Sequence, residues 1–327
     1  MSRKILFITK TAKSASTRYR AQGYSDYLRA AGWEPLYVEG DGGLRHRLGL
    51  LRHASRADVT VVIRKTFAAI FRRGLRAAAR RLIFDFDDSI FTGSKKPSAM
   101  RQRRFAAMVR LSDQVWAGNS YLAEHSGKHN RSVLVLPTSV EFSSYAVLAE
   151  KPQGVLDLVW IGSSLSRPYI EASLPVLESA ARQLPNLRLK VIADFDLHSK
   201  VFPILSKPWS SATEVSELAS AHVGVAPMTD DPWARGKCGL KVLQYMAAGL
   251  PVVASPVGAN KDIVVDGVTG FLAQEPEEWV EALSRLEADA ALRRSLGEAG
   301  RQLVEKEFSY ASNFRKMRES LNGLVGS

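Results

Sequence analysis

Short runs of apolar residues alternate with longer stretches of helical periodicity along most of the chain. The runs predict strands at residues 5–8, 36–38, 59–63, 82–84, 114–117, 132–136, 156–161, 187–192, 223–226, 252–254 and 270–272. Helical patterns between them cover about residues 18–31, 68–80, 99–111, 169–184, 211–220 and 240–248. Short apolar strands that alternate with helices are typical of parallel sheets covered on both faces, so we predict an α/β protein.

The alternation is interrupted once, between residues 143 and 154, where periodicity is weak and Pro152 and Gly154 occur. This stretch predicts a linker between two doubly wound domains, residues 1–150 and residues 151–308. Because ligands of such domains bind at the carboxyl ends of the strands, the expected site is a central cleft that the two domains face.

Composition narrows the class of protein. The 327 residues are 46% hydrophobic and 24% charged, which excludes disorder as the main state. A single cysteine, Cys238, excludes a disulfide scaffold or a cysteine-rich metal cluster and suits a reducing cytoplasm. The basic start of the chain, with Arg3 and Lys4, precedes only a short apolar run, so we expect no secretory signal and no spanning segment of about 20 apolar residues.

Positive charge is concentrated in the first half of the chain. Residues 1–150 hold 26 of the 45 Lys and Arg but only 12 of the 33 Asp and Glu, which leaves 19 and 21 for the rest. The first half is therefore at +14 and the second at −2, within a total of +12. Such asymmetry indicates a polyanionic partner or a contribution to solubility.

The segment from Arg235 to Pro251 is the strongest candidate for chemistry. Helical spacing places Lys237, Lys241 and Gln244 on one stripe, near a helix N-terminus that the macrodipole makes unfavourable for cations. A bound diphosphate would resolve this conflict, because it would also accept hydrogen bonds from the exposed backbone N–H groups. The alternative is a solvated basic helix face.

Several motifs resemble retaining glycosyltransferases of family 4, whose fold is GT-B. The donor-binding half is matched at Met246–Ser255, Val257–Gly258, Asp266–Leu272 and Val159–Ser163. The acceptor half of a bacterial branch of the family is similar to Ser16–Arg20, Arg64–Lys65, Phe84–Asp88 and Ala117–Leu122. In that branch, a helix of the donor-binding half begins Gly-Lys-Cys-Gly-Leu-Lys. The GT-B resemblance also implies that residues 309–327 form a helix that packs back on the first domain.

The resemblance implies an enzyme that moves a sugar, with retention, from a nucleoside-diphosphate sugar to a hydroxyl of a glycan or lipid-linked acceptor, as in polysaccharide biosynthesis. We expect no cofactor and no metal. The family's helix carries two glutamates, whose aligned positions here are Gly236 and Gln244. The expected catalytic residues are Lys237, Lys241 and Asp87; the expected donor-binding residues are Gly162, Ser163, Ser164, Asp231, Arg235, Gly236, Gly239 and Gln244; the expected acceptor-binding residues are Arg18, Arg20, Asp85 and Asp88.

Two features leave alternatives open. The run Asp85-Phe86-Asp87-Asp88 after a strand is read as facing the cleft, but it could also hold Mg²⁺ or Mn²⁺, or pair with Arg64 or Lys65. Transferase activity competes with nucleotide-sugar epimerisation and with non-catalytic binding of a nucleotide sugar or polyanion.

Three basic stretches in the first half combine arginines with apolar residues. Amphipathic basic helices lie on anionic membranes, so we expect a cytoplasmic protein with a peripheral membrane site, although the apolar residues could be core. Nucleic acid is a weaker partner, because aromatic residues are not interleaved with the basic runs. The stretches contain Leu44, Leu48 and Leu51 with Arg45, Arg47, Arg52 and Arg56; Phe67, Ile70, Phe71 and Leu75 with Arg72, Arg73, Arg76, Arg80 and Arg81; and Lys95, Lys96, Arg101, Arg103 and Arg104.

Overall fold

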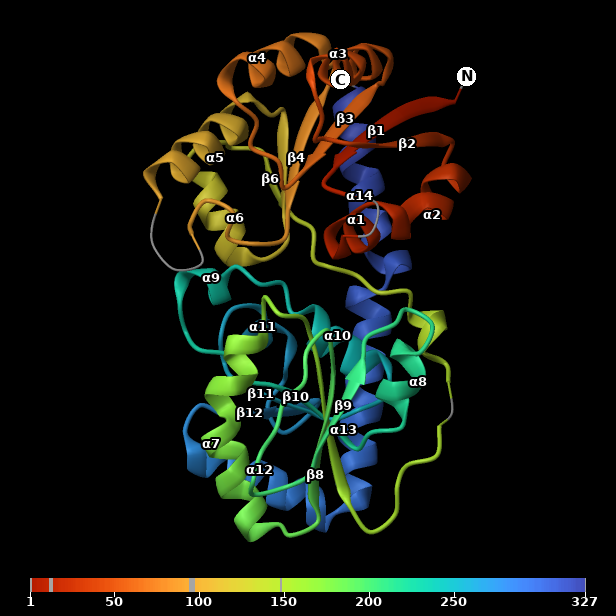
Figure 1. Cartoon of the computed structure of the whole chain (residues 1–327). Coiled ribbons are helices and arrows are strands. Elements are labelled where there is room, and N and C mark those ends of the chain that lie inside the picture. The colour runs from red at the N-terminus through yellow and green to blue at the C-terminus, as the bar shows by residue number, and fades with distance from the viewer. Residues whose placement is uncertain (1, 12–13, 94–97, 148, 327) are drawn as a thin grey trace. The chain divides into compact units, whose positions relative to one another are not determined.

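The computed structural model describes residues 2–11, 14–93, 98–147 and 149–326. The chain divides into two compact units. Unit 1 comprises Met1–Ser139, Arg235–Cys238 and Tyr310–Ser327, and unit 2 comprises Val140–Ala234 and Gly239–Ser309. Each unit contains one sheet, and helices surround both sheets (Figure 1).

The sheet of unit 1 has six parallel strands in the order β2-β1-β3-β4-β5-β6. Strands β3 and β4 are buried along their whole length and are largely apolar, with Thr60 and Asp85 as their polar members. The carboxyl ends of β3, β4 and β5 meet at one edge of the sheet. The strands are β1 (Arg3–Thr9), β2 (Trp33–Glu39), β3 (Val59–Ile63), β4 (Leu82–Phe86), β5 (Gln114–Ala117) and β6 (Val133–Val135).

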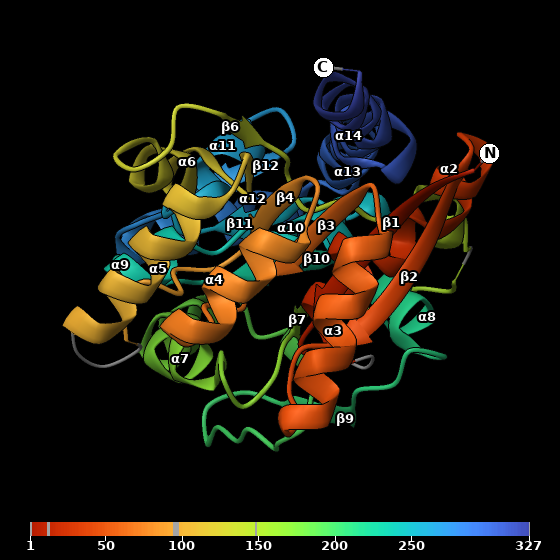
Figure 2. The ribbon, with the colours of Figure 1, turned by 90° about the horizontal axis from the view of Figure 1, so that it is seen from above.

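Helices connect successive strands of unit 1, and the C-terminal helix returns to this unit. Helices α3, α4 and α5 lie side by side (Figure 2), and their inward residues join one hydrophobic cluster with Phe84 and Phe86. The helices are α1 (Ala15–Arg20), η1 (Gln22–Tyr24), α2 (Ser25–Ala30), α3 (Leu44–Arg56), α4 (Ala69–Ala78), α5 (Ala99–Leu111), α6 (Ser120–Gly127) and α14 (Tyr310–Val325).

The sheet of unit 2 also has six parallel strands, in the order β12-β11-β10-β7-β8-β9. Strand β7 lies between β10 and β8 and is buried throughout. The strands are β7 (Leu156–Ile161), β8 (Leu187–Ala193), β9 (Ile204–Pro208), β10 (Val223–Ala226), β11 (Val252–Ala254) and β12 (Gly270–Leu272).

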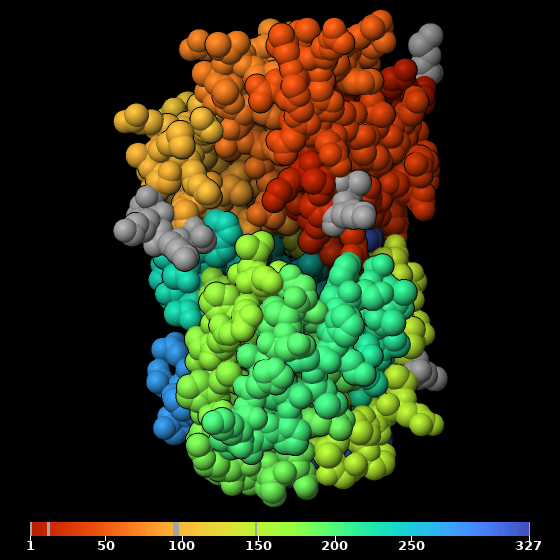
Figure 3. All heavy atoms as spheres, viewed as in Figure 1, coloured from red at the N-terminus to blue at the C-terminus, as the bar shows by residue number. Residues whose placement is uncertain are grey.

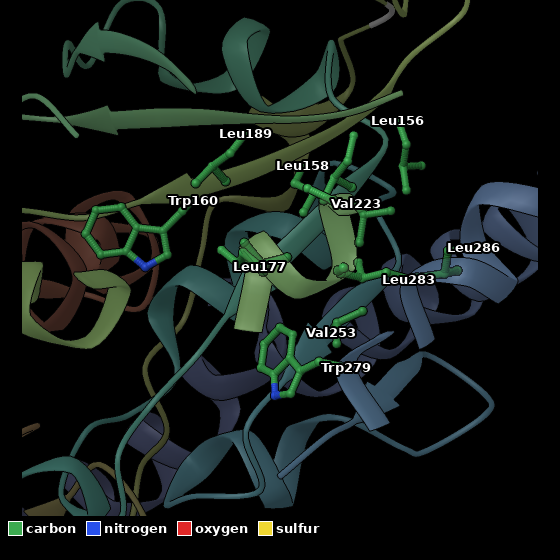
Figure 4. Packing of buried hydrophobic residues seen from close by; sticks show 14 of the residues in the cluster. Leu156, Leu158, Trp160, Leu177, Leu189, Val223, Val253, Trp279, Leu283 and Leu286 are labelled. Carbon is green, nitrogen blue, oxygen red and sulfur yellow. The ribbon is translucent and has the colours of Figure 1, made fainter. Parts of the chain in front are cut away.

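The core of unit 2 lies between this sheet and helices such as α7 and α12. Figure 4 shows Trp160 and Leu158 of β7 with Leu177 of α7 and Leu283 of α12 in this cluster. The helices are η2 (Phe142–Tyr145), α7 (Arg167–Gln183), α8 (Glu214–Ala219), α9 (Pro232–Arg235), α10 (Leu240–Ala247), α11 (Ala259–Ile263), α12 (Pro276–Ala288), α13 (Ala290–Leu303) and η3 (Val304–Phe308).

The predicted fold class is confirmed: the chain folds into two parallel, doubly wound α/β sheets. The chain leaves unit 1 after Ser139, whereas the sequence pattern placed the boundary at residue 150. It returns to unit 1 for Arg235–Cys238, an excursion that periodicity does not reveal. No helix within the described ranges combines the length and apolar character needed to cross a bilayer.

Candidate functional site

The first candidate site in unit 2 is the turn that follows β7. A Cβ added to Gly162 would lie 2.2 Å from the ring of Trp160, so this position requires glycine. The backbone N–H and the hydroxyl of Ser164 donate to the carboxylate of Asp194, at 2.7 and 2.9 Å. Ser163 and Ser164 are both exposed, so the turn is shaped by internal bonds yet open to solvent.

Asp194 lies directly after β8 and carried no signal in the sequence analysis. Its limited desolvation works to raise its pKa, but the hydrogen bonds from Ser164 outweigh it, so the pKa lies below its ordinary value. The carboxylate is therefore charged at neutral pH. It accepts the hydrogen bond of the Ser164 N–H, which could otherwise be donated to a phosphate.

Lys241 lies in the first turn of α10, at the carboxyl end of β7. Its Nζ is 4.1 Å from the centroid of the Trp160 ring, within the range of a cation–π contact. The hydroxyl of Tyr245, one turn further along α10, accepts the N–H of Ile161 at 2.9 Å and donates to the carbonyl of Val225 at 3.3 Å. Helix α10 is thus fixed against the ends of β7 and β10, where ligands of parallel sheets bind.

Gln244 is buried rather than exposed on a basic stripe, which corrects the expectation from helical spacing. Its Nε2 donates to Oε1 of Glu214 at 2.8 Å, and Trp209 donates to the other carboxylate oxygen at 2.7 Å. Tyr145 also donates to Oε1 of Glu214, at 3.4 Å. A buried carboxylate therefore does lie beside the position where the family places its second glutamate, but it comes from α8.

Lys237 does not share a helix with Lys241, so the predicted common stripe is wrong. Helix α10 begins at Leu240, and its N-cap Gly239 has a left-handed φ of 67°. A Cβ at Gly239 would lie 2.4 Å from Ile263, so its left-handed conformation and close packing both favour glycine. This turn of the backbone separates Lys237, in unit 1, from Lys241, in unit 2.

The segment Arg235–Cys238 is held on unit 1 by close backbone contacts. The side-chain amide of Asn119 donates to the carbonyls of Arg235 and Lys237, at 3.2 and 3.0 Å. A Cβ at Gly236 would lie 1.9 Å from the Ser89 hydroxyl, and the buried Cys238 joins the hydrophobic cluster of unit 1. Gly236 was predicted to allow close approach of a diphosphate. In the structure, the space that a side chain at this position would need is occupied by Ser89.

Asp231 has a local structural role. Its Oδ1 accepts the backbone N–H groups of Trp233 and Ala234, at 2.7 and 2.8 Å, at the start of α9. Arg235, the last residue of α9, is exposed. Contact of Asp231 and Arg235 with a donor stays a prediction.

The acidic run of unit 1 is organised first by Arg20. This guanidinium donates to both oxygens of Asp85, from Nε at 3.0 Å and Nη2 at 2.5 Å, and from Nη1 to the carbonyl of Leu136 at 2.6 Å. Burial opposes the charge on Arg20, but the Asp85 carboxylate outweighs it and raises the pKa of the guanidinium. Both side chains are almost fully buried, so the pair is a structural feature of the sheet edge.

Arg64 organises the rest of the acidic run. Its Nη2 lies 2.7 Å from Asp88 and its Nη1 3.5 Å from Asp87. Among non-glycine residues that the structure describes, Arg64 alone has a positive φ, 58°, a conformation associated with functional sites. Burial raises the pKa of Asp88 against the attraction of Arg64 and Lys237. Arg64 therefore pairs with this run, whereas Lys65 pairs with Asp41.

The remaining expectations for unit 1 concern Arg18 and metal binding. Arg18 packs over the ring of Tyr19, 5.1 Å from its centroid, and donates to the Tyr19 hydroxyl at 3.3 Å. Within the described ranges, no group of at least three His, Cys, Asp or Glu side chains is arranged to hold a metal ion. The predicted basic residues Lys95 and Lys96 lie outside the described residues.

Comparison with known proteins shows that part of the second unit is similar to glycosyltransferases. Residues 209–289, which include Glu214, Lys241 and Gln244, match the family model described as glycosyl transferases group 1. The chain is similar to the sulfoquinovosyl transferase SQD2 of Arabidopsis thaliana, with 33% identity over 43% of this chain and 29% of that protein. It is also 36% identical to an alpha-maltose-1-phosphate synthase of Mycobacterium tuberculosis, over 29% of this chain and 25% of that protein. The matched regions thus span less than a third of these relatives.

Solved structures match over the whole chain at low identity. Anabaena HepE, solved with UDP and glucose, has a TM-score of 0.76 at 14% identity and covers 98% of this chain and 100% of its own. Sucrose-phosphate synthase from Thermosynechococcus elongatus has a TM-score of 0.76 at 16% identity, with 100% of both chains covered. The protein has the GT-B fold of glycosyltransferases. The match within its second unit is to group 1 glycosyltransferases, further matches are to a sulfoquinovosyl transferase and to a synthase, and together they favour neither epimerisation nor a purely binding role.

Proposed function

We propose that this protein is a retaining glycosyltransferase that uses a nucleoside-diphosphate sugar as donor and a hydroxyl of a glycan or lipid-linked molecule as acceptor. The observation that carries the proposal is the position of Lys241 at the carboxyl end of β7, inside the segment that matches group 1 glycosyltransferases. The UDP complex of the structural neighbour HepE supports a nucleotide-linked donor, and the name of the sulfoquinovosyl transferase SQD2 supports transfer of a sugar.

In this proposal, Lys241 stabilises the departing diphosphate. Negative charge accumulates on the phosphate oxygens as the sugar bond breaks, and a fixed cation beside them lowers the barrier. The cation–π contact with buried Trp160 fixes the direction of the Lys241 side chain before the donor binds. Charge neutralisation by lysine makes a metal unnecessary, and retention follows from attack on the same face of the sugar as the departing group.

The turn Gly162–Ser164 is proposed to contact the donor, with its shape maintained by Asp194. Gln244 is proposed to meet the ribose, and Glu214 would fix the direction of its amide. Glu214 is therefore a positioning residue in this proposal.

Unit 1 is proposed to bind the acceptor. Asp87 and Asp88, held by Arg64, offer carboxylate oxygens to sugar hydroxyls, and Asp87 retains the catalytic role expected from the family resemblance. Lys237 is also proposed to be a catalytic residue. Arg20 and Asp85 would contribute by supporting the sheet edge below the acidic run.

Binding of nucleoside diphosphates tests the role of Lys241. We would titrate UDP, GDP and ADP into the wild-type protein, Lys241→Gln, and the control Lys261→Gln, which removes an exposed lysine from α11 of the same unit. Loss of one charge-assisted contact should weaken the best nucleotide about tenfold to a hundredfold in Lys241→Gln only. Equal affinity of all three proteins would refute the assignment of Lys241.

Turnover tests the activity itself. Release of nucleoside diphosphate from a panel of nucleotide sugars, with candidate hydroxyl acceptors, should fall by orders of magnitude in Lys241→Gln and remain unchanged in Lys261→Gln. Tight nucleotide-sugar binding without any transfer to an acceptor would instead support a non-catalytic binding protein.

A further inference from the structure

Three neighbouring helices of unit 1 carry positive charge and no negative charge. Helices α3, α4 and α5 together contain eleven arginines and no aspartate or glutamate. The helices lie side by side on one face of the sheet (Figure 2), and their atoms lie within the orange to gold part of the surface in Figure 3. We call this surface the arginine face; its arginines are Arg45, Arg47, Arg52, Arg56, Arg72, Arg73, Arg76, Arg101, Arg103, Arg104 and Arg110.

Most of this charge is not neutralised by acidic side chains in the part of the chain that the structure describes. Arg76 pairs with Asp113 at 2.6 Å, while Arg72 donates to a backbone carbonyl. The pKa of Arg72 is lowered by burial and by the nearby charges of Arg73 and Arg104, which shows like charges gathered between α4 and α5. The arginines that form no ion pair with any residue in the described part of the chain include Arg45, Arg52, Arg56, Arg73, Arg103 and Arg104.

Large aliphatic side chains are exposed among these arginines. Leu44 and Leu48 of α3 are 75% and 57% exposed, Ile70 of α4 is 88% exposed and Met100 of α5 is 59% exposed. Other residues, such as Leu50 of α3 and Leu75 of α4, supply the contacts with the core. In the apolar stripe of Leu44, Leu48 and Leu51, the first two members are therefore exposed, so the alternative that these residues form core does not hold for them.

We propose that the arginine face binds the surface of an anionic phospholipid bilayer. Guanidinium groups bind lipid phosphates with paired hydrogen bonds, and the aliphatic side chains enter the boundary between headgroups and acyl chains. Nucleic acid fits less well, because the exposed large apolar residues of these helices are aliphatic and give bases no aromatic surface for stacking. The inference uses only unit 1 and does not depend on the proposed transferase activity.

Sedimentation with vesicles tests this inference on the full chain. The vesicles consist of phosphatidylcholine alone or of phosphatidylcholine and phosphatidylglycerol in equal parts, at low and high salt. Wild-type protein should sediment with the anionic vesicles only, and less at high salt because exposed charges are screened. Failure to bind anionic vesicles at low salt would overturn the proposal.

Two sets of variants separate the contributions of charge and aliphatic side chains. Arg45→Gln/Arg52→Gln/Arg73→Gln should weaken binding by roughly a hundredfold, whereas the control Arg131→Gln/Arg294→Gln/Arg318→Gln removes equal charge from exposed positions elsewhere and should bind as wild type. Equal loss in both triple variants would refute a localised lipid surface.

The aliphatic variant Leu44→Ser/Leu48→Ser/Ile70→Ser keeps every charge and should still bind anionic vesicles more weakly than wild type. Circular dichroism would confirm that each variant is folded. If this variant binds vesicles as wild type does, and short duplex DNA displaces the protein from them, a nucleic-acid surface replaces the lipid surface.

Discussion

Restoring the carboxylate that the family carries at position 244 should destabilise this protein. In the structure, Nε2 of Gln244 donates to Oε1 of the buried Glu214 at 2.8 Å. Gln244→Glu replaces that donor by an oxygen, so two buried carboxyl groups would face each other. We expect the native state of the variant to retain one shared proton on this pair, because two adjacent carboxylates cannot both remain charged without a large cost.

The size of the effect follows from comparing two costs. Two unit charges about 2.8 Å apart, at an effective dielectric constant of about 20, repel by about 6 kcal/mol. Protonating one ordinary glutamate with a pKa of about 4.3 at pH 7 costs about 4 kcal/mol, at about 1.4 kcal/mol per pH unit. The protein takes the less costly route, so we expect Gln244→Glu to lose about 4 kcal/mol of unfolding free energy at pH 7.

The loss must depend on pH in a defined direction. The pair's pKa in the folded variant is raised above that of the unfolded chain, so the unfolded state releases a proton that the folded state keeps. The destabilisation is therefore small near pH 4, about 1 kcal/mol at pH 5, and grows until the pH reaches the raised folded value.

Urea denaturation of wild type and Gln244→Glu at pH 5 and pH 7 measures this effect. Gln302→Glu is the control, because it adds the same carboxylate at an exposed position of α13 in the same unit. The swapped variant Glu214→Gln/Gln244→Glu restores one donor and one carboxylate, and its stability should vary less with pH than that of Gln244→Glu. An equal loss at both pH values in Gln244→Glu would refute the like-charge explanation.

Two further groups are expected to respond to perturbation. Arg20→Met leaves Asp85 buried without its partner and should lower the free energy of unfolding by about 3–5 kcal/mol, measured by thermal denaturation. The double variant Arg20→Met/Asp85→Leu should lose less stability. A single variant as stable as wild type would contradict a stabilising buried pair. Burial and the nearby cations Lys151 and Arg293 lower the pKa of His222 to about 4, and its Nδ1 accepts the N–H of Asp157 at 3.0 Å. Since the unfolded histidine titrates near pH 6.5, stability should fall as the pH drops from about 6.5 to 4. His222→Gln should be less sensitive to pH in that window, and an unchanged profile would exclude His222 as the source.

Sequence periodicity was sufficient for most of the strands. The predicted bounds 59–63, 114–117, 156–161 and 223–226 match β3, β5, β7 and β10, because strands buried on both faces consist mainly of apolar residues. The short β9 was missed because its residues are exposed or half-buried, so its sequence lacks the apolar run of a buried strand.

The candidate site was less accessible to sequence reasoning. Glu214 and Gln244 are far apart in the chain, and their hydrogen bond depends on how α8 and α10 pack in unit 2. The role of Asp194 likewise depends on its hydrogen bond with Ser164, which follows the neighbouring strand β7. Neither carboxylate carries a local pattern that distinguishes it from a surface residue.

The amino-acid sequence by itself determined two parallel α/β sheets, because strand burial and helix amphipathicity are local properties of the chain. It also determined where the positive charge lies, in the first half. Only the tertiary structure decided that Lys237 and Lys241 separate at Gly239, since the left-handed turn there and the amide of Asn119 direct the backbone of 235–238 onto unit 1. Helical spacing assumes that a helix continues, whereas contacts distant in sequence determine where it begins.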